Sequence, residues 1–156
     1  MGTFNENGDD KMGNIFYDYV SELIKDYPSL DYEWKNNNQE ILFKKKTDQG
    51  FDITIGYHNE NYIYVNTDKG FHDHFEVIDD DFSETLKSVM GLVRDLLSYK
   101  MRIKEILAGN TPRKWILQNY IDGEWKDEHI VGNIFWNYFA KKSERIYYND
   151  VLPSRY

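Results

Sequence analysis

The first hydrophobic pattern in the chain has the spacing of a helix. Pro28 ends this pattern, because a proline disfavours helical backbone in the residue before it. Residues 1–11 are rich in Gly, Asn and Asp and have no period, so we expect a disordered tail there and a helix over about residues 12–27. The apolar positions that recur at i, i+3, i+4 and i+7 are Ile15, Phe16, Tyr19, Val20, Leu23, Ile24 and Tyr27.

From residue 32 the period falls to two, which is typical of strands with one buried face. Short segments rich in Asn, Asp and Gly interrupt this pattern, and these residues favour tight turns because they tolerate left-handed backbone. The pattern predicts an antiparallel meander of five strands. The alternating runs lie at residues 32–35, 41–45, 51–57, 62–66 and 71–77.

A second helix is predicted over residues 81–99. Asp81 and Glu84 have the spacing of an N-cap residue and its partner three positions later. Asp79 and Asp80 bring further negative charge to the positive end of the helix dipole. The apolar stripe that this helix would bury consists of Phe82, Leu86, Val89, Met90, Val93, Leu96 and Leu97.

Strand patterns return after residue 100. We expect strands at residues 101–107, 114–121 and 124–131. The last two are joined by Asp122-Gly123, a pair typical of two-residue hairpin turns. An apolar run at 134–139 continues the pattern, a turn follows at 141–143, and a strand at 145–148 precedes a C-terminal tail at 151–156.

These patterns together predict an α+β fold in a single domain, residues 12–150, with the element order α-β(5)-α-β(4). The apolar stripes of the helices need a partner surface, and an antiparallel sheet of about eight or nine strands offers one if both helices pack on one face. The aromatic residues, 17% of the chain, exceed what two stripes and one sheet face can bury. Either the sheet curls strongly, or its other face exposes aromatic side chains.

Composition excludes several classes of protein. The 156 residues include no Cys, which removes disulfide scaffolds, thiolate zinc sites and cysteine nucleophiles. The net charge of −8 argues against an extended nucleic-acid surface, which needs Lys and Arg to neutralise phosphates. The chain has no signal-peptide pattern and no apolar stretch of about 20 residues, so we expect a cytoplasmic protein without membrane contact.

The charge is unevenly distributed. Residues 1–99 hold 20 Asp+Glu and 9 Lys+Arg, whereas residues 100–156 hold 7 and 10. The densest acidic stretch, residues 68–84, is either a solvated face combined with a helix cap or an anionic surface that attracts a basic partner. Its acidic members are Asp68, Asp73, Glu76, Asp79, Asp80, Asp81 and Glu84.

His72, His74 and Glu76 have a spacing that metal ligands can use. Alternate residues of a strand project to the same side, so two imidazoles and a carboxylate could meet one ion. The alternative is that Phe75 and its apolar neighbours face the core, which leaves these three side chains on a solvent-exposed face. The three residues are therefore weak candidates for metal ligands.

Asp73 disagrees with the pattern around it, because the period of two assigns it to the apolar face. A buried carboxylate without a partner is costly. Asp73 should therefore lie at the strand's edge, be turned outward by a bulge, or have a partner or a raised pKa inside. The account we prefer is that the predicted strand boundary is wrong.

Catalysis has little support in the sequence. No serine lies in a Gly-x-Ser-x-Gly motif, and the ten glycines form no phosphate-binding loop. Any two of the 27 carboxylates could converge in space, which the sequence does not reveal. We assign no catalytic residue and expect no cofactor.

In composition the chain is similar to small, acidic, Tyr- and Asn-rich immunity proteins and phage-encoded inhibitors. The abundance of Asn, Lys, Ile and Tyr is also typical of AT-rich bacterial or phage genomes. We therefore hypothesise a non-enzymatic protein that neutralises a basic toxin or effector through an acidic, aromatic surface. The residues assigned to partner binding are Asp73, Glu76, Asp79, Asp80, Asp81, Glu84, Trp34, Tyr62 and Tyr64.

Two alternatives remain open. The first is a small-molecule-binding or enzymatic domain with an aromatic-lined pocket. The second is a structural module that self-associates, for example as a homodimer, through an open sheet face. A deep pocket containing histidines or carboxylates would favour the first alternative, and a flat or shallow acidic face would favour protein binding.

Overall fold

The computed structural model describes residues 6–59, 61–132 and 139–153, with residues 6–10 described by their backbone only. These residues form two helices and nine strands in the order α-β(5)-α-β(4), which confirms the predicted α+β class. The elements are α1 (Glu6–Asp26), β1 (Tyr32–Lys35), β2 (Glu40–Phe43), β3 (Ile53–His58), β4 (Tyr62–Thr67), β5 (His72–Glu76), α2 (Phe82–Leu97), β6 (Met101–Ala108), β7 (Thr111–Ile121), β8 (Glu124–Gly132) and β9 (Lys142–Tyr148).

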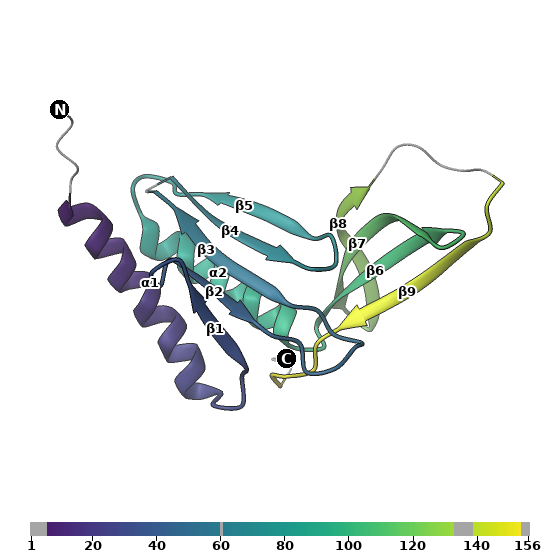
Figure 1. The fold of residues 1–156 in the computed structure, drawn as a ribbon, viewed down its shortest axis with the longest axis horizontal. Helices are drawn as coiled ribbons and strands as arrows, with labels where there is room; N and C mark the ends of the chain where they lie inside the picture. Colours follow the sequence, from purple (N-terminus) through teal and green to yellow (C-terminus); the bar gives the residue numbers. More distant parts are fainter. Residues whose placement is uncertain (1–5, 60, 133–138, 154–156) are drawn as a thin grey trace.

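The strands form two open antiparallel sheets instead of the single sheet that the sequence predicted. The first has the order β1-β2-β3-β4-β5 and the second the order β8-β7-β6-β9 (Figure 1). Helix α2 separates β5 from β6 in the chain, and the strands after it pair among themselves. Alternation along a strand decides which side chains are buried, but it does not choose the neighbouring strand.

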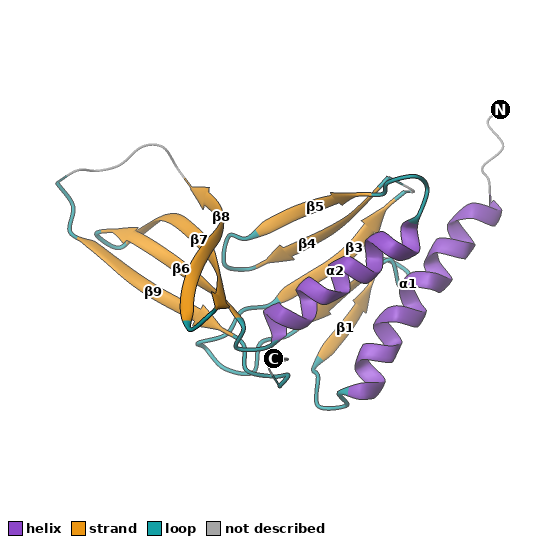
Figure 2. Ribbon diagram, turned by 180° about the vertical axis from the view of Figure 1, so that it is seen from behind, coloured by secondary structure: helices purple, strands orange, loops and turns teal. Residues whose placement is uncertain are grey.

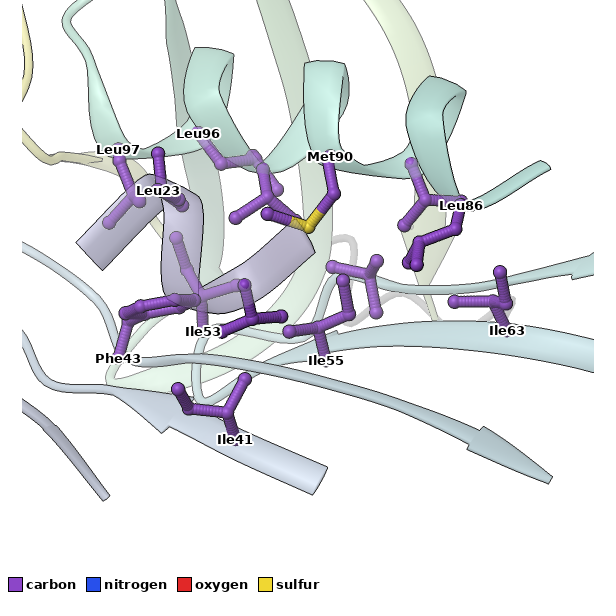
Figure 3. Close-up of a cluster of buried hydrophobic side chains, with 14 of the residues drawn as sticks. Leu23, Ile41, Phe43, Ile53, Ile55, Ile63, Leu86, Met90, Leu96 and Leu97 are labelled. Atoms are coloured by element: carbon purple, nitrogen blue, oxygen red, sulfur yellow. The ribbon is translucent and has the colours of Figure 1, made fainter. Parts of the chain in front are cut away.

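Both helices pack on one face of the first sheet, as the sequence predicted (Figure 2). Phe16 of α1 meets Tyr57 of β3 edge to face, with ring centroids 5.2 Å apart. The isoleucines of β2, β3 and β4 face α2 (Figure 3), and full burial of one such side chain stabilises the fold by about 1.5–3 kcal/mol. Buried side chains of this core include Leu23, Ile41, Phe43, Ile53, Ile55, Ile63, Leu86, Met90, Leu96 and Leu97.

Local sequence signals predicted the start of α2 correctly but not the start of α1. Asp81 Oδ1 accepts a hydrogen bond from the Glu84 backbone N–H at 3.1 Å, which confirms the predicted N-cap of α2. Helix α1 begins at Glu6 and not at residue 12, so residues 6–11 of the expected tail are helical. Packing anchors the amphipathic part of α1, and each residue added to an existing helix gains a hydrogen bond without a nucleation cost.

Two strands of the second sheet begin earlier than predicted. β7 begins at Thr111, because residues before the predicted start pair with the end of β6 across a bulge at Ile106/Leu107. β9 begins at Lys142, inside the predicted turn, where it pairs with Ala108 of β6. Except for Phe139, the apolar run at residues 134–139 lies outside the described residues.

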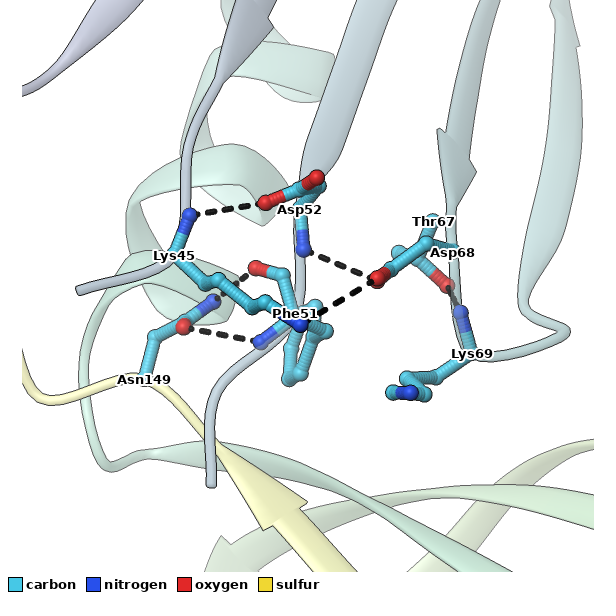
Figure 4. A network of polar contacts seen from close by, with 7 residues as sticks. All are labelled: Lys45, Phe51, Asp52, Thr67, Asp68, Lys69 and Asn149. Atoms are coloured by element: carbon cyan, nitrogen blue, oxygen red, sulfur yellow. Dashed lines mark hydrogen bonds and ion pairs between the residues drawn. The ribbon is translucent and has the colours of Figure 1, made fainter. Parts of the chain in front are cut away.

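The two sheets meet where their strands end (Figure 4). Asn149, which is buried, accepts a hydrogen bond from the Phe51 N–H at 3.2 Å through Oδ1. Its Nδ2 donates to the carbonyl oxygens of Phe51 at 3.0 Å and of Leu96 at 3.2 Å. In the neighbouring turns the Asp52 N–H donates to Asp68 Oδ1 at 2.9 Å. The bonds of Asn149 join the end of the second sheet to α2 and to the first sheet, and the Asp52–Asp68 bond ties two connections of the first sheet together.

The inner face of the second sheet adds a polar cluster to this junction. The buried carboxylate of Glu105 accepts a hydrogen bond from Trp115 Nε1 at 2.9 Å. The Tyr147 hydroxyl donates a hydrogen bond to Glu105 Oε1 at 3.4 Å, and Arg145 Nη1 lies 4.0 Å from the same oxygen. Gly70 in the β4–β5 turn has a φ of +81° and lies against Trp115, where any Cβ would collide with the indole ring. The apolar side chains that this face adds to the core are Met101, Ile103 and Leu117.

Candidate functional site

No described helix or strand covers the second face of the first sheet, which we call the open face (Figure 1). Ile63 and Val65 of β4 are fully buried, whereas Tyr62 and Tyr64 project to the open face, in keeping with the alternation expected over residues 62–66. Cross-strand register assigns the other members. The open face comprises Glu33, Lys35, Glu40, Leu42, Thr54, Gly56, His58, Tyr62, Tyr64, Asn66, His72, His74 and Glu76.

Tyr64 is held in one position on the open face. Its hydroxyl donates a hydrogen bond to Glu40 Oε2 at 2.5 Å. Its ring lies over Gly56 of the neighbouring strand, where a Cβ would collide with the phenol. Burial of the phenol, together with the hydrogen bond to Glu40 and the charge of that carboxylate, raises the pKa of Tyr64 above its usual range. Tyr64 therefore presents a neutral, oriented ring.

Further rings lie next to Tyr64. Tyr62 stacks on His74 with ring centroids 5.0 Å apart and an interplanar angle of 16°. The ring centroids of His58 and Tyr62 are 5.5 Å apart, and those of His74 and Tyr64 are 6.5 Å apart. Both histidines are exposed and Tyr62 is half-buried. The result is an aromatic surface with polar edges, which suits contact with a protein partner.

The metal-ligand candidates share this face but do not converge. His72, His74 and Glu76 are exposed on one side of β5, as the period of two predicted. His74 is stacked on Tyr62, and the described part of the chain contains no group of three His, Asp or Glu side chains that could hold a metal ion. Alternate residues of a strand lie about 7 Å apart, so their side chains must lean together to share an ion.

The acidic loop, which we define as Asp79, Asp80 and Asp81, follows β5 directly. The Val77 N–H donates to the Asn61 carbonyl oxygen at 2.9 Å and holds the start of the loop beside β4. Asp79 and Asp80 have φ angles of 53° and 55°, a left-handed conformation that Asp tolerates better than most residues. All three carboxylates are exposed, and none forms an ion pair with a described residue. Their negative charge is therefore offset only in part, by the N-terminus of α2 that Asp81 caps and by Lys11, which lines the same hollow as Asp80 and Asp81.

A hollow of about 450 Å³ lies beside the acidic loop, on the side of the sheet that the helices cover. Met12 and Ile15 of α1, with Phe82 of α2, contribute apolar surface to it. Asp80 and Asp81 contribute carboxylates. The remaining lining residues are Lys11, Val77 and Ser83, so its lining contains acidic groups but no histidine.

Trp34 lies apart from the other predicted binding residues. Its strand, β1, is the far edge of the first sheet, and its side chain is half-buried on the helix-covered face. Tyr17 stacks on its ring at 5.2 Å and Phe16 meets it edge to face at 6.1 Å. Trp34 thus packs under α1 and does not join Tyr62 and Tyr64.

Asp73 also lies on the helix-covered face, opposite Val65, in agreement with the alternation. Asp73 lies within β5, whose register shows no bulge, so neither a bulge nor a wrong strand boundary explains it; β5 is an edge strand, and Asp73 has a hydrogen-bond partner there. The partner is the His74 backbone N–H, which donates to Asp73 Oδ1 at 2.8 Å. An inward-facing charge that occupies backbone donors of an edge strand hinders pairing with a further strand.

Sequence reasoning missed Glu40, Gly56 and His58 as members of the site. Gly56 was the available signal, because a glycine inside a strand often marks the close approach of a neighbouring group. The identity of that group depends on the register between β3 and β4, which places Gly56 opposite Tyr64.

Comparisons of the chain with protein-family models, with curated protein sequences and with solved structures find no match. Neither described helix combines the length and the hydrophobicity that crossing a membrane requires.

Proposed function

We propose that this chain is a non-enzymatic binding protein that holds a basic protein partner, in the manner of an immunity protein that neutralises a toxin or effector. The observation that carries the proposal is that the open face ends at the acidic loop. Tyr62 of β4 lies opposite Glu76 of β5, and the chain continues from Glu76 into Asp79 within a few residues. A partner seated on the aromatic surface would therefore contact Glu76 and lie close to Asp79, whereas Asp80 and Asp81 line the hollow on the helix-covered side and act on such a partner only through their negative potential.

The two parts contribute in different ways. Exposed carboxylates without ion pairs act at a distance, so the acidic loop steers and orients a basic surface. Tyrosines bury a large ring at a small cost in conformational entropy, and Tyr64 is already ordered by Glu40 and Gly56. Tyr62 and Tyr64 are therefore the expected anchors.

Affinity capture from a lysate of the source organism tests this proposal. The baits are the wild-type chain, a loop variant (Asp79→Asn with Asp80→Asn) and an open-face variant (Tyr62→Ser with Glu76→Gln). Asn tolerates left-handed backbone as Asp does, so the loop variant keeps its conformation. A control variant with Asp26→Asn removes exposed charge from the end of α1.

We expect the wild-type and control chains to retain one basic protein, and both other variants to lose it. Salt should weaken the binding, since exposed charges are screened within about 8 Å at physiological ionic strength. If the captured protein is acidic, or if all four baits retain it equally, the proposal is wrong. If light scattering finds a dimer that the open-face variant lacks, the open face serves a second copy of the chain.

The hollow favours a second candidate function, the binding of a cationic, partly apolar small molecule. Its apolar walls and two carboxylates, set against the single cation Lys11, are complementary to such a ligand. Thermal-shift screening of organic amines tests it, with Ile15→Trp as the variant that fills the hollow and leaves the open face unchanged. A thermal shift that is the same in wild type and Ile15→Trp excludes the hollow as the site.

A further inference from the structure

We propose that the outer face of the second sheet carries a separate site for a carboxylate of an acidic protein segment, with Arg102 as the receptor. The outer face is the side opposite Glu105. Arg102 of β6 lies there between Gln118 of β7 and Tyr148 of β9, its cross-strand neighbours. This site shares no residue with the open face, so it stands independently of the proposed function.

Two contacts fix the guanidinium of Arg102. Its central carbon lies 4.1 Å from the centroid of the Trp125 ring, so the cation packs against the indole. Its Nε donates a hydrogen bond to Gln118 Oε1 at 2.8 Å. Gln118 is buried, and its own Nε2 donates to Asp127 Oδ1 at 2.7 Å. The Arg102 side chain is therefore ordered before any partner binds, which reduces the entropy that binding must overcome.

The two terminal Nη groups of Arg102 form no ion pair with a described residue and can bind a ligand. Arg145 on the same sheet differs, because it lies 4.0 Å from the buried Glu105. The two Nη groups of an arginine form a planar fork that binds a carboxylate through two parallel hydrogen bonds. Arg102 presents such a fork in a fixed orientation.

Aromatic rings surround this fork. Tyr99 meets Trp125 and Tyr148 edge to face, with centroids 5.6 Å and 4.8 Å apart. Tyr120 lies 5.1 Å from Trp125. Tyr99 and Tyr120 remain 44% and 42% exposed, so a partner can contact them. Trp, Tyr and Arg are the residues that most often dominate the binding energy of protein interfaces.

The surrounding charges favour an acidic peptide over a nucleic acid. Residues 100–156 carry more Lys and Arg than Asp and Glu, and Lys104 shares the outer face with Arg102. Asp127 of β8, however, lies opposite Gln118 on the same outer face, whereas Glu124 and Lys126 project to the inner side. The carboxylate of Asp127 would repel a continuous run of phosphates, whereas a single ligand carboxylate needs only the two Nη groups of Arg102.

Selection of random short peptides displayed on phage tests the site, with the full wild-type chain as the target. Affinities of the selected peptides are then measured by calorimetry for wild type, Arg102→Lys and Lys104→Gln. Arg102→Lys keeps the charge but loses the fork, whereas Lys104→Gln removes a charge from the same face. Thermal unfolding of each variant establishes that it is folded.

We expect selected peptides to contain Asp, Glu or a free carboxyl terminus. Arg102→Lys should weaken their binding about tenfold or more, and Lys104→Gln less than about threefold. In wild type, the NMR signal of the Arg102 Nε–H should shift when the peptide binds. The proposal is overturned if no peptide is selected, if the peptides lack carboxylates, if Arg102→Lys binds them as wild type does, or if single-stranded oligothymidylate binds more tightly than they do.

Discussion

The two sheets of this molecule use similar alternating sequences but are stabilised differently. The first sheet buries a face of Ile, Val and Phe side chains beneath α1 and α2. The second has no helix of its own, and its inner face meets the first sheet through a few apolar residues, the Glu105 cluster and Asn149. Apolar packing thus stabilises the first sheet, whereas directional polar contacts position the second.

The exposed faces differ as well. On the first sheet, exposed carboxylates of the acidic loop lie at the end of a row of tyrosines and histidines. On the second, an arginine lies among Tyr and Trp rings. The net charge of −8 therefore combines a surface bordered by the acidic loop with one that carries Arg102 and Lys104 beside Asp127, and the two partners proposed above differ in charge.

The largest effect should come from the core beneath α2. Leu86 is fully buried, and Leu86→Ala should lower the free energy of unfolding by about 2–5 kcal/mol, because it removes apolar contacts and leaves a cavity. Urea-induced unfolding measures the change. Lys87→Ala, at the exposed neighbouring position, should change it by about 0.5 kcal/mol or less. If both variants unfold alike, helix packing does not stabilise this region.

A smaller and more local effect should follow at Glu105. Glu105→Leu leaves the Trp115 Nε1–H and the Tyr147 hydroxyl without their acceptor, at a cost of about 1–3 kcal/mol. Hydrogen exchange should accelerate in β6 to β9 more than in β3 and β4. Glu105→Gln keeps a side-chain acceptor, so it should lose less stability than Glu105→Leu. Equal acceleration in both sheets would contradict the distinction between them.

The smallest effect concerns Tyr64. Its pKa is raised in the folded state, so folding favours the neutral phenol and the associated stability is fully present below pH about 10. Above that pH the unfolded chain ionises first, and wild type should lose stability relative to Tyr64→Phe. Unfolding free energies measured between neutral pH and pH about 10.5 test this. In a Glu40→Gln background, the loss of unfolding free energy relative to Tyr64→Phe at high pH should be smaller. Parallel curves of unfolding free energy against pH for wild type and Tyr64→Phe would contradict this prediction.

Local features of the site could be predicted because they depend on neighbours in the sequence. The Asp81–Glu84 cap and the orientation of Tyr62 and Tyr64 follow from spacing within one helix and one strand. Trp34 could not be placed in the same way. Its strand is short, and the position of α1 over the sheet edge decides that it packs inside.

The sequence by itself determined the class of fold, the order of elements and the buried side of most strands, because these depend on periodicity and on turn and capping residues close in the chain. Three features were decided by the tertiary structure alone. They are the division of the strands into two sheets, the position of Asp73 in an edge strand, and the contacts of Tyr64 with Glu40 and Gly56. These features depend on which strands become neighbours and in which register. Strand pairing and register are determined by packing between residues far apart in the chain, so they cannot be read from the alternation within one strand.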